Sequence, residues 1–258
     1  MLEIRNVHKT FNLGTINEKH ALNGVNLKLD AGDFVTVIGG NGAGKSTVLN
    51  AVAGTWPVDE GSILIDGVDV TGLPEFKRVF QDPMTGTTAT MQIDENLALA
   101  ARRGQRRGLS WGITKKEKER YHELLKELDL GLEDRMTSKV GLLSGGQRQA
   151  VTLLMASLQK PKLLLLDEHT AALDPKTAAK VLTLTDKIIK ENNLTAMMVT
   201  HNMRDAIAHG NRLIMMHEGK VILNIAGEEK KKLTVADLLQ QFERVSGEEF
   251  TSDKELLS

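Results

Sequence analysis

The 258-residue sequence contains no cysteine, which excludes disulfide bonds and metal sites built from thiolates. Its 33 Lys and Arg nearly balance 34 Asp and Glu, so a net charge of −1 favours neither nucleic acid nor a membrane surface as partner. No apolar run approaches the ~20 residues that cross a bilayer. The first five residues lack a basic stretch followed by an apolar one, so no signal peptide is expected. We find no internal repeat. A chain of this length can bury the core of one domain or of two joined lobes.

A glycine-rich loop at residues 39–46 fits the pattern G-x-x-x-x-G-K-[ST]. The β-branched run Phe34–Ile38 before it predicts a buried strand, and residues 45–53 after it predict a helix that Gly54 ends. Glycines let the backbone turn several N–H groups toward phosphate oxygens. A chance glycine-rich turn is the alternative, but the strand before and the helix after favour a phosphate loop. The expected ligands of a nucleotide are Gly39, Asn41, Gly42, Ala43, Gly44, Lys45 (β and γ phosphates), Ser46 (also Mg²⁺) and Thr47 (α phosphate).

Two carboxylates follow a second apolar run, Leu163–Leu166. The carboxyl end of such a strand is where α/β sheets place ligands. Asp167 is suited to hold Mg²⁺ through its water shell, and Glu168 is suited to polarise the water that attacks a γ phosphate. The alternative is a pair of exposed turn carboxylates. Four leucines running into the pair favour the first interpretation, because buried carboxylates need a metal or a partner.

The segment Leu143–Gln147 (Leu-Ser-Gly-Gly-Gln) completes a set of three motifs, in the order 39, 143, 167. Together they resemble the ATP-binding cassette ATPase family, whose members power transporters, from about Leu2 to the region of Gly227. Alone, Ser-Gly-Gly is an ordinary helix cap. The resemblance implies instead that the nucleotide of an opposing subunit is read here, so that two chains close head to tail over two ATP molecules. The residues concerned are Ser144, Gly145, Gly146 and Gln147.

The resemblance also assigns four single residues. Gln81 matches the glutamine loop, which contacts Mg²⁺ and the attacking water, and His201 matches the switch histidine beside the γ phosphate. Asp174 lies in the loop that crosses the dimer interface. Phe11 stands where the family has an aromatic that stacks on adenine, and a role in the core is an equal alternative for it.

Alternation of strands and helices around a glycine loop argues a parallel sheet flanked by helices. The expected fold is α/β, a P-loop NTPase with a mainly parallel sheet core, an N-terminal antiparallel β subdomain and an inserted α-helical subdomain. We assign residues 1–258 to a single ATPase domain. Within it, residues 1–80 and 161–227 form the nucleotide-binding core with the β subdomain, 81–160 the helical subdomain, and 228–258 a C-terminal helix and tail. In the helical part, Thr114 and Glu117 predict a capping box, and Gly131 is expected to close the helix that follows. Lys230 to Lys232 are expected at the surface.

Two features depart from the family. His169 replaces the usual proline after the carboxylates, and the spacing from Lys45 to Gln81 is short by several residues. An arginine cluster, Arg102-Arg103 and Arg106-Arg107, allows contact with a membrane partner or lipid head groups, but a solvated helix surface is the favoured interpretation.

The resemblance implies an ATPase that binds ATP and Mg²⁺ as a homodimer at the cytoplasmic face of a membrane. Its partners would be integral membrane permease subunits and an extracellular solute-binding protein, with no nucleic acid. Residues 167–175 resemble a branch whose permeases are similar to branched-chain amino-acid permeases, so import of an amino acid or similar small solute is expected.

Three alternative functions are open to a chain with a phosphate loop. An ATPase of translation or DNA repair usually has two cassettes or a long coiled-coil insertion, whereas only about sixty residues separate Gln81 from Leu143. A non-catalytic nucleotide sensor predicts loss of Glu168 or His201, and both are present. A P-loop small-molecule kinase would not need residues 143–147.

Overall fold

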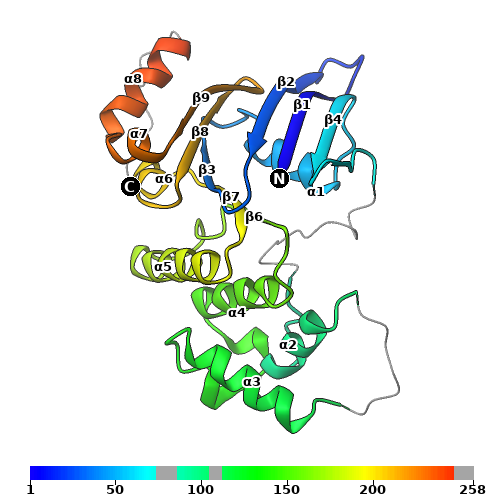
Figure 1. Cartoon of the computed structure of the whole chain (residues 1–258), viewed down its shortest axis with the longest axis vertical. Coiled ribbons are helices and arrows are strands. Elements are labelled where there is room, and N and C mark those ends of the chain that lie inside the picture. Colours follow the sequence, from blue (N-terminus) through cyan, green and yellow to red (C-terminus); the bar gives the residue numbers. More distant parts are fainter. Residues whose placement is uncertain (74–85, 105–111, 247–258) are drawn as a thin grey trace. The chain divides into compact units, whose positions relative to one another are not determined.

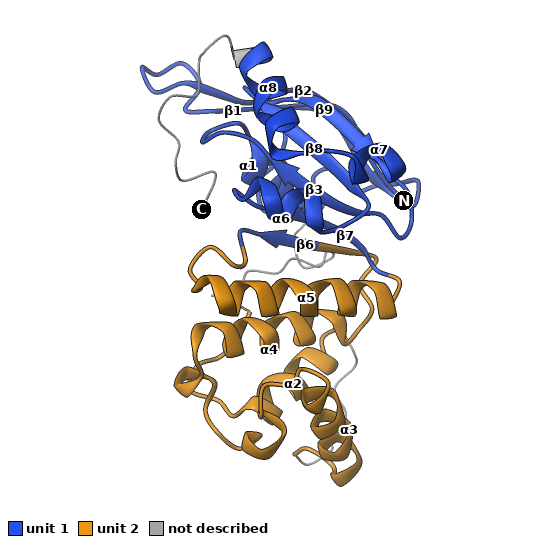
Figure 2. Cartoon of the chain, turned by 90° about the vertical axis from the view of Figure 1, so that its left-hand side faces the viewer, with its two compact units in different colours: residues 1–80, 165–168, 194–258 blue, residues 81–164, 169–193 orange. Residues whose placement is uncertain are grey.

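The computed structural model describes residues 1–73, 86–104 and 112–246 (Figure 1). The chain divides into two compact units, shown in different colours in Figure 2. Unit 1 comprises residues 1–80, 165–168 and 194–258, and unit 2 comprises residues 81–164 and 169–193. Unit 2 thus contains residues 161–164 and 169–193 in addition to the segment 81–160 assigned from the sequence, and the subdomain boundaries remain a prediction.

The first sheet of unit 1 has four strands in the order β2-β1-β4-β5. Alternating apolar residues drive this pairing, because one face of each strand is buried and the other is not. In β1, Leu2, Ile4 and Val7 are buried. β1 pairs antiparallel with β2 and β4, which confirms the antiparallel β subdomain. The strands are β1 (Leu2–Phe11), β2 (Lys19–Leu29), β4 (Glu60–Ile65) and β5 (Val68–Asp69).

Within the described ranges, the second sheet has five strands in the order β6-β7-β3-β8-β9. β3 is parallel to β7 and to β8, and all its residues are buried, as the continuous apolar run predicted. The edge strand β9 is antiparallel to β8 and was not predicted, because its residues are mostly half-buried and lack a clear alternation. The strands are β3 (Phe34–Ile38), β6 (Leu163–Asp167), β7 (Thr195–Val199), β8 (Arg212–His217) and β9 (Lys220–Ala226).

The helices of unit 1 are α1 (Lys45–Ala53), α6 (Met203–Ala208), α7 (Gly227–Lys231) and α8 (Val235–Ser246). Gly54 caps α1 in the left-handed conformation (φ 85°), as predicted. The expected C-terminal helix is α8, whose Leu238 and Phe242 pack into a cluster with Ile38 and Met215. Helix α8 therefore forms part of the hydrophobic core that packs against β3, the strand that leads into the phosphate loop.

The prediction that Lys230 lies at the surface is wrong, since its side chain is only 2% exposed. Its Nζ donates to the carbonyl oxygens of His209 and Gly210 and to Thr36 Oγ1. His209 directly follows α6, and an ammonium group satisfies carbonyls left without partners at a helix end. A run of three lysines beside glutamates gave no sign of this burial. Lys230 instead links α7 by hydrogen bonds to the end of α6 and to β3.

Unit 2 is helical, with α2 (Ile93–Ala101), α3 (Lys115–Lys126), α4 (Gly145–Ser157), α5 (Pro175–Glu191) and the short 3₁₀ turns Glu133–Arg135 and Val140–Leu142. The capping box of Thr114 and Glu117 is present at the start of α3. α3 ends at Lys126, so the prediction that Gly131 closes it is wrong. The chain leaves the helix earlier because Asp129 adopts φ 52°, two residues before Gly131. Among the described residues, no helix is both long and apolar enough to cross a membrane.

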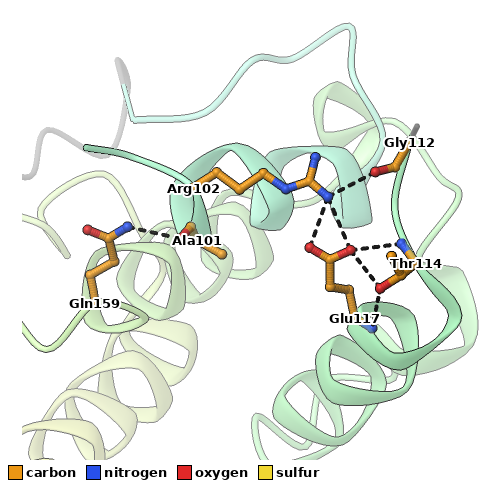
Figure 3. A network of polar contacts seen from close by, with 6 residues as sticks. All are labelled: Ala101, Arg102, Gly112, Thr114, Glu117 and Gln159. Atoms are coloured by element: carbon orange, nitrogen blue, oxygen red, sulfur yellow. Dashed lines mark hydrogen bonds and ion pairs between the residues drawn. The ribbon is translucent and has the colours of Figure 1, made fainter. Parts of the chain in front are cut away.

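Arg102 of the arginine cluster joins α2 to the start of α3 (Figure 3). Its guanidinium donates to both carboxylate oxygens of Glu117, at 2.9 and 3.1 Å, and to the carbonyl of Gly112 at 2.9 Å. The Thr114 N–H also donates to Glu117. This bond, together with those from Arg102, lowers the pKa of Glu117 to about 2. The structural use of Arg102 supports the interpretation of this segment as helix surface. Arg106 and Arg107 lie outside the described residues.

Candidate nucleotide-binding and catalytic site

The phosphate loop of unit 1 is held against two strands at positions where only glycine fits. A Cβ atom on Gly39 would lie 2.2 Å from the carbonyl oxygen of Met216, and one on Gly44 would lie 2.5 Å from that of Ala21. Both glycines also adopt positive φ, 150° and 98°. Behind the loop, an ideal Cβ on Gly40 would lie 3.4 Å from the Phe242 ring of α8. The loop is therefore fixed in shape before any ligand arrives.

Lys45 begins α1 and its side chain is buried over this loop. Its Nζ donates to the carbonyl oxygens of Gly39 at 2.8 Å and Gly40 at 3.1 Å. Burial lowers the pKa of Lys45, while the charges of Glu168 and Asp167 act in the opposite direction. A phosphate group, with its full negative charge, is a stronger partner for this ammonium than two carbonyls. This placement suits Lys45 to bind phosphate, and that role stays a prediction.

Ser46 and Asp167 meet beside the loop, with Ser46 Oγ donating to Asp167 Oδ1 at 3.2 Å. Burial raises the pKa of Asp167, and the Ser46 hydrogen bond opposes that shift. A hydroxyl and a carboxylate whose charge is poorly solvated suit Mg²⁺, which takes oxygen ligands and commonly shares them with substrate phosphates. The described residues contain no cluster of three or more His, Asp or Glu able to hold a metal alone. The pair therefore fits an ion held jointly with a nucleotide.

Replacing Asp167 with Asn is expected to raise the melting temperature of the nucleotide-free protein and to abolish Mg²⁺-dependent hydrolysis. Because the folded-state pKa of Asp167 is raised, its ionised form destabilises the fold above that pKa, and the penalty disappears as pH falls through it. Asparagine keeps the acceptor for Ser46 without the charge. In a protein of this size, each kcal/mol corresponds to roughly 2–4 °C in melting temperature.

Calorimetry from about pH 4 to about pH 8 measures this effect. The advantage of Asp167→Asn should be greatest at the highest pH and vanish at the lowest. The exposed Asp134 supplies the control variant Asp134→Asn, which should melt like the wild type at every pH. A variant at Asp167 that melts at or below the wild-type temperature at pH 8 contradicts the account.

Glu168 and His201 form a close pair at the ends of β6 and β7. His201 Nε2 lies 2.5 Å from Glu168 Oε1, and the two side chains are 38% and 32% exposed. Glu168 has the left-handed φ of 45°, and its N–H donates to the carbonyl of Val199 at 3.1 Å. Such backbone strain in a non-glycine residue recurs at functional sites. The arrangement presents a carboxylate to solvent while one of its oxygens is held by the histidine.

Residues 144–147, which the resemblance assigns to the nucleotide of an opposing subunit, lie in unit 2 at the start of α4. Ser144 is the N-cap: its Oγ accepts from the Gln147 N–H at 3.3 Å, and Gln147 Oε1 accepts from the Ser144 N–H at 3.2 Å. The hydroxyl hydrogen stays available for donation. A Cβ on Gly146 would lie 2.0 Å from Thr177 Cγ2, and one on Gly145 would lie 3.0 Å from Leu173 Cδ2. Close packing of α4 on α5 is therefore a second reason for glycine here, beside access to a phosphate.

Asp174 and His169 both have structural partners in unit 2. Asp174 is the N-cap of α5 and accepts from the Thr177 N–H at 3.0 Å. His169 is buried, with Nε2 3.1 Å from Thr185 Oγ1. The histidine that replaces the family's proline thus ties the segment after the carboxylates to α5. Gln81 lies outside the described residues, so its expected role stays a prediction.

Phe11 lies at the end of β1, half-buried and in edge contact with Trp56 (ring centroids 5.0 Å apart, interplanar angle 81°). Lys9 Nζ lies 5.6 Å from the centre of the ring. Phe11 is outside the buried core, which leaves it usable as a stacking surface. Opposite it, Lys19 of β2 reaches the phosphate loop at Gly42, and no sequence pattern had singled this lysine out.

Comparisons with known proteins agree with this geometry. The family described as "ABC transporter" matches residues 22–171. The chain is 44% identical to the tyrosine transport ATP-binding protein of Clostridioides difficile over 94% of this chain and 99% of that protein. It is 34% identical to the spermidine/putrescine import ATP-binding protein PotA of Haemophilus influenzae over 86% of this chain, and spans 56% of that relative.

Among solved structures, the chain is similar to the ATP-binding cassette MJ0796, a dimer in a post-hydrolysis state bound to ADP and Pi. The TM-score is 0.74 and the identity 31%, over 88% of this chain and 98% of that one. The family match covers more than half of the chain, and the relatives and the fold agree with it. This chain therefore belongs to the ABC transporter family, as one of its ATP-binding, ATP-hydrolysing subunits.

Proposed function

We propose that the chain is the ATPase subunit of an importer for an amino acid or a similar small organic solute, working as a pair of copies on a separate membrane permease. The observation that carries the ATPase chemistry is the contact of Glu168 with His201 in the unit that also holds the phosphate loop. A carboxylate beside a built phosphate site can orient the attacking water for hydrolysis of a γ phosphate, and the histidine contact holds that carboxylate in place.

The proposed site residues of unit 1 each have a distinct task in ATP hydrolysis. Lys45 leaves the loop carbonyls to neutralise phosphate oxygens, and Glu168 accepts a proton from the attacking water. His201 keeps one Glu168 oxygen in place, so that the other faces the water. Ser46 and Asp167 would hold Mg²⁺, which when bound offsets charge on the phosphate oxygens. The contact of Gln81 with the ion, which the resemblance implies, stays a prediction.

The two-copy arrangement is supported by α4. Ser144 caps that helix and keeps a hydroxyl hydrogen to donate, and the positive end of a helix favours an anion. We propose that Ser144, Gly145, Gly146 and Gln147 of one copy close on the nucleotide held by the other, and that Asp174 lies at this interface. The dimeric state of the similar cassette MJ0796 agrees with it.

The solute class rests on similarity. The relative named as a tyrosine transport ATP-binding protein matches along nearly its whole length. Residues 167–175 resemble the branch that serves amino-acid-type importers. An extracellular solute-binding protein and a position at the cytoplasmic face of the membrane complete the proposal. The alternative of an ATPase in translation or DNA repair is not favoured, since the named relatives are import or transport subunits.

Co-purification tests the proposed partners. The tagged chain, isolated from the membranes of its own cells, should bring down a multi-span permease and an extracellular binding protein, identified by mass spectrometry. The ligand of that binding protein should be an amino acid or a close analogue. The same tag on an unrelated protein is the control. Ribosomal or DNA-associated partners without any membrane protein would overturn the transport role and leave the ATPase chemistry standing.

A further inference from the structure

Lys19 places a second ammonium group at the phosphate loop. An ideal Cβ on Gly42 would lie only 2.8 Å from Lys19 Nζ, so the side chain lies directly over this glycine. Lys19 begins β2 and pairs opposite Phe11, the last residue of β1. Its strand partner Phe11 and the glycine loop that its Nζ reaches both belong to unit 1.

The surroundings of Lys19 contain no anion that explains this position. Within the part of the chain that the structure describes, its Nζ has neither a hydrogen bond nor an ion pair. The adjacent Glu18 instead accepts from the N–H of Gly14 at 2.7 Å and lies 3.4 Å from His20 Nε2. An exposed lysine gains nothing from a backbone glycine, whereas an anion bound in the loop would lie within its reach.

The two lysines approach the loop at different residues. Lys45 Nζ binds the carbonyls of Gly39 and Gly40, and the charges of Asp167 and Glu168 act on it. Lys19 reaches Gly42 from the side of Phe11. A nucleotide with its base at Phe11 and its terminal phosphate at Lys45 would therefore pass Lys19 with its inner phosphates.

We propose that Lys19 is a nucleotide-binding residue that contacts the α and β phosphates. This inference rests on the proposed nucleotide site and adds a residue to it. ATP and ADP share these two phosphates, so Lys19 stabilises both complexes equally. Lys45 and the Mg²⁺ ligands act on the γ phosphate as well. Loss of the Lys19 contact should therefore raise the Kd for ATP and the Kd for ADP by the same factor.

The test compares Lys19→Met with Lys28→Met by equilibrium titration of ATP and ADP, each with Mg²⁺. Lys28 is an exposed lysine on the same strand, which makes it a matched control. Lys19→Met should raise the Kd of both nucleotides by about tenfold, as loss of a charge-assisted bond does, and leave their ratio unchanged. Lys19→Arg should restore binding. The difference should shrink at high salt, because exposed charges are screened.

Wild-type affinity of Lys19→Met for both nucleotides overturns the proposal. Weakening of ATP alone also overturns it, because the contact would then be to the γ phosphate. Equal weakening in the control Lys28→Met would show a general effect of charge and overturn it as well. A wild-type protein that binds neither nucleotide would instead refute the proposed function, so the two failures are distinguishable.

Discussion

Glu168→Gln is expected to lower kcat for ATP hydrolysis by about 10²–10⁴-fold while leaving the Kd for ATP nearly unchanged. Glutamine keeps an oxygen for His201 Nε2, which lies 2.5 Å from Glu168 Oε1, but it cannot accept a proton from water. Lys45, Ser46 and the loop glycines remain as they are, so binding is retained. A phosphate-release assay and an equilibrium titration on the same preparation measure the two quantities.

A matched control for this variant is Glu218→Gln. Glu218 has the same φ of 45° as Glu168 and is 84% exposed, so it reproduces the backbone conformation without the site. Its kcat should stay within about twofold of wild type, as for surface changes in general. Normal turnover in Glu168→Gln would remove Glu168 as the base. Equal loss in the control would point to the turn conformation instead of the carboxylate.

Ser144→Arg is expected to abolish ATP-driven pairing of two copies and to lower hydrolysis by about 10²-fold or more, with ATP affinity of the single copy unchanged. The hydroxyl that we propose to face the phosphate is lost, and removal of one such donor alone costs about 10²–10³ in rate. A long side chain at the start of α4 also prevents close approach of a second copy. Nucleotide binding by the single copy should stay because the substitution leaves the loop glycines, Lys45 and Ser46 unchanged.

The substitution also removes the N-cap of α4, which costs about 1 kcal/mol by itself. Thr114→Arg removes the equivalent capping box of α3 and serves as the control for this loss. Size-exclusion chromatography with light scattering should show a dimer with ATP for Thr114→Arg and only monomer for Ser144→Arg. Dimer formation by Ser144→Arg would contradict the composite site.

Local patterns predicted the parts of the site that are contiguous in the chain. The loop glycines, the helix from Lys45 to Ala53 and the buried strand before them follow from spacing and β-branched composition. The pairing of β6 with β7 then brings Glu168 to His201, which the sequence predicted only through a resemblance. Contacts of this kind depend on strand order, and a single sequence does not encode strand order in any local pattern.

The elements that the sequence missed have the same origin. Lys230 is buried because α7 lies against α6 and β3, although its own segment is lysine- and glutamate-rich. Lys19 is one exposed lysine on a strand, and only the packing of β2 against the phosphate loop, where the Ala21 carbonyl meets Gly44, places it at Gly42. The early end of α3 reflects Asp129 in a left-handed conformation, for which Gly131 two residues later was the more obvious candidate.

If two copies of this chain close over ATP and hydrolysis reopens them, a variant that binds but does not hydrolyse ATP should stay closed. Sedimentation velocity of Glu168→Gln, with and without ATP and Mg²⁺, measures this. We expect the 28.3 kDa monomer without nucleotide and a species of twice that mass with ATP, which persists because the variant cannot hydrolyse it. A monomer at saturating ATP, in a preparation shown by titration to bind the nucleotide, would contradict closure of two copies over ATP.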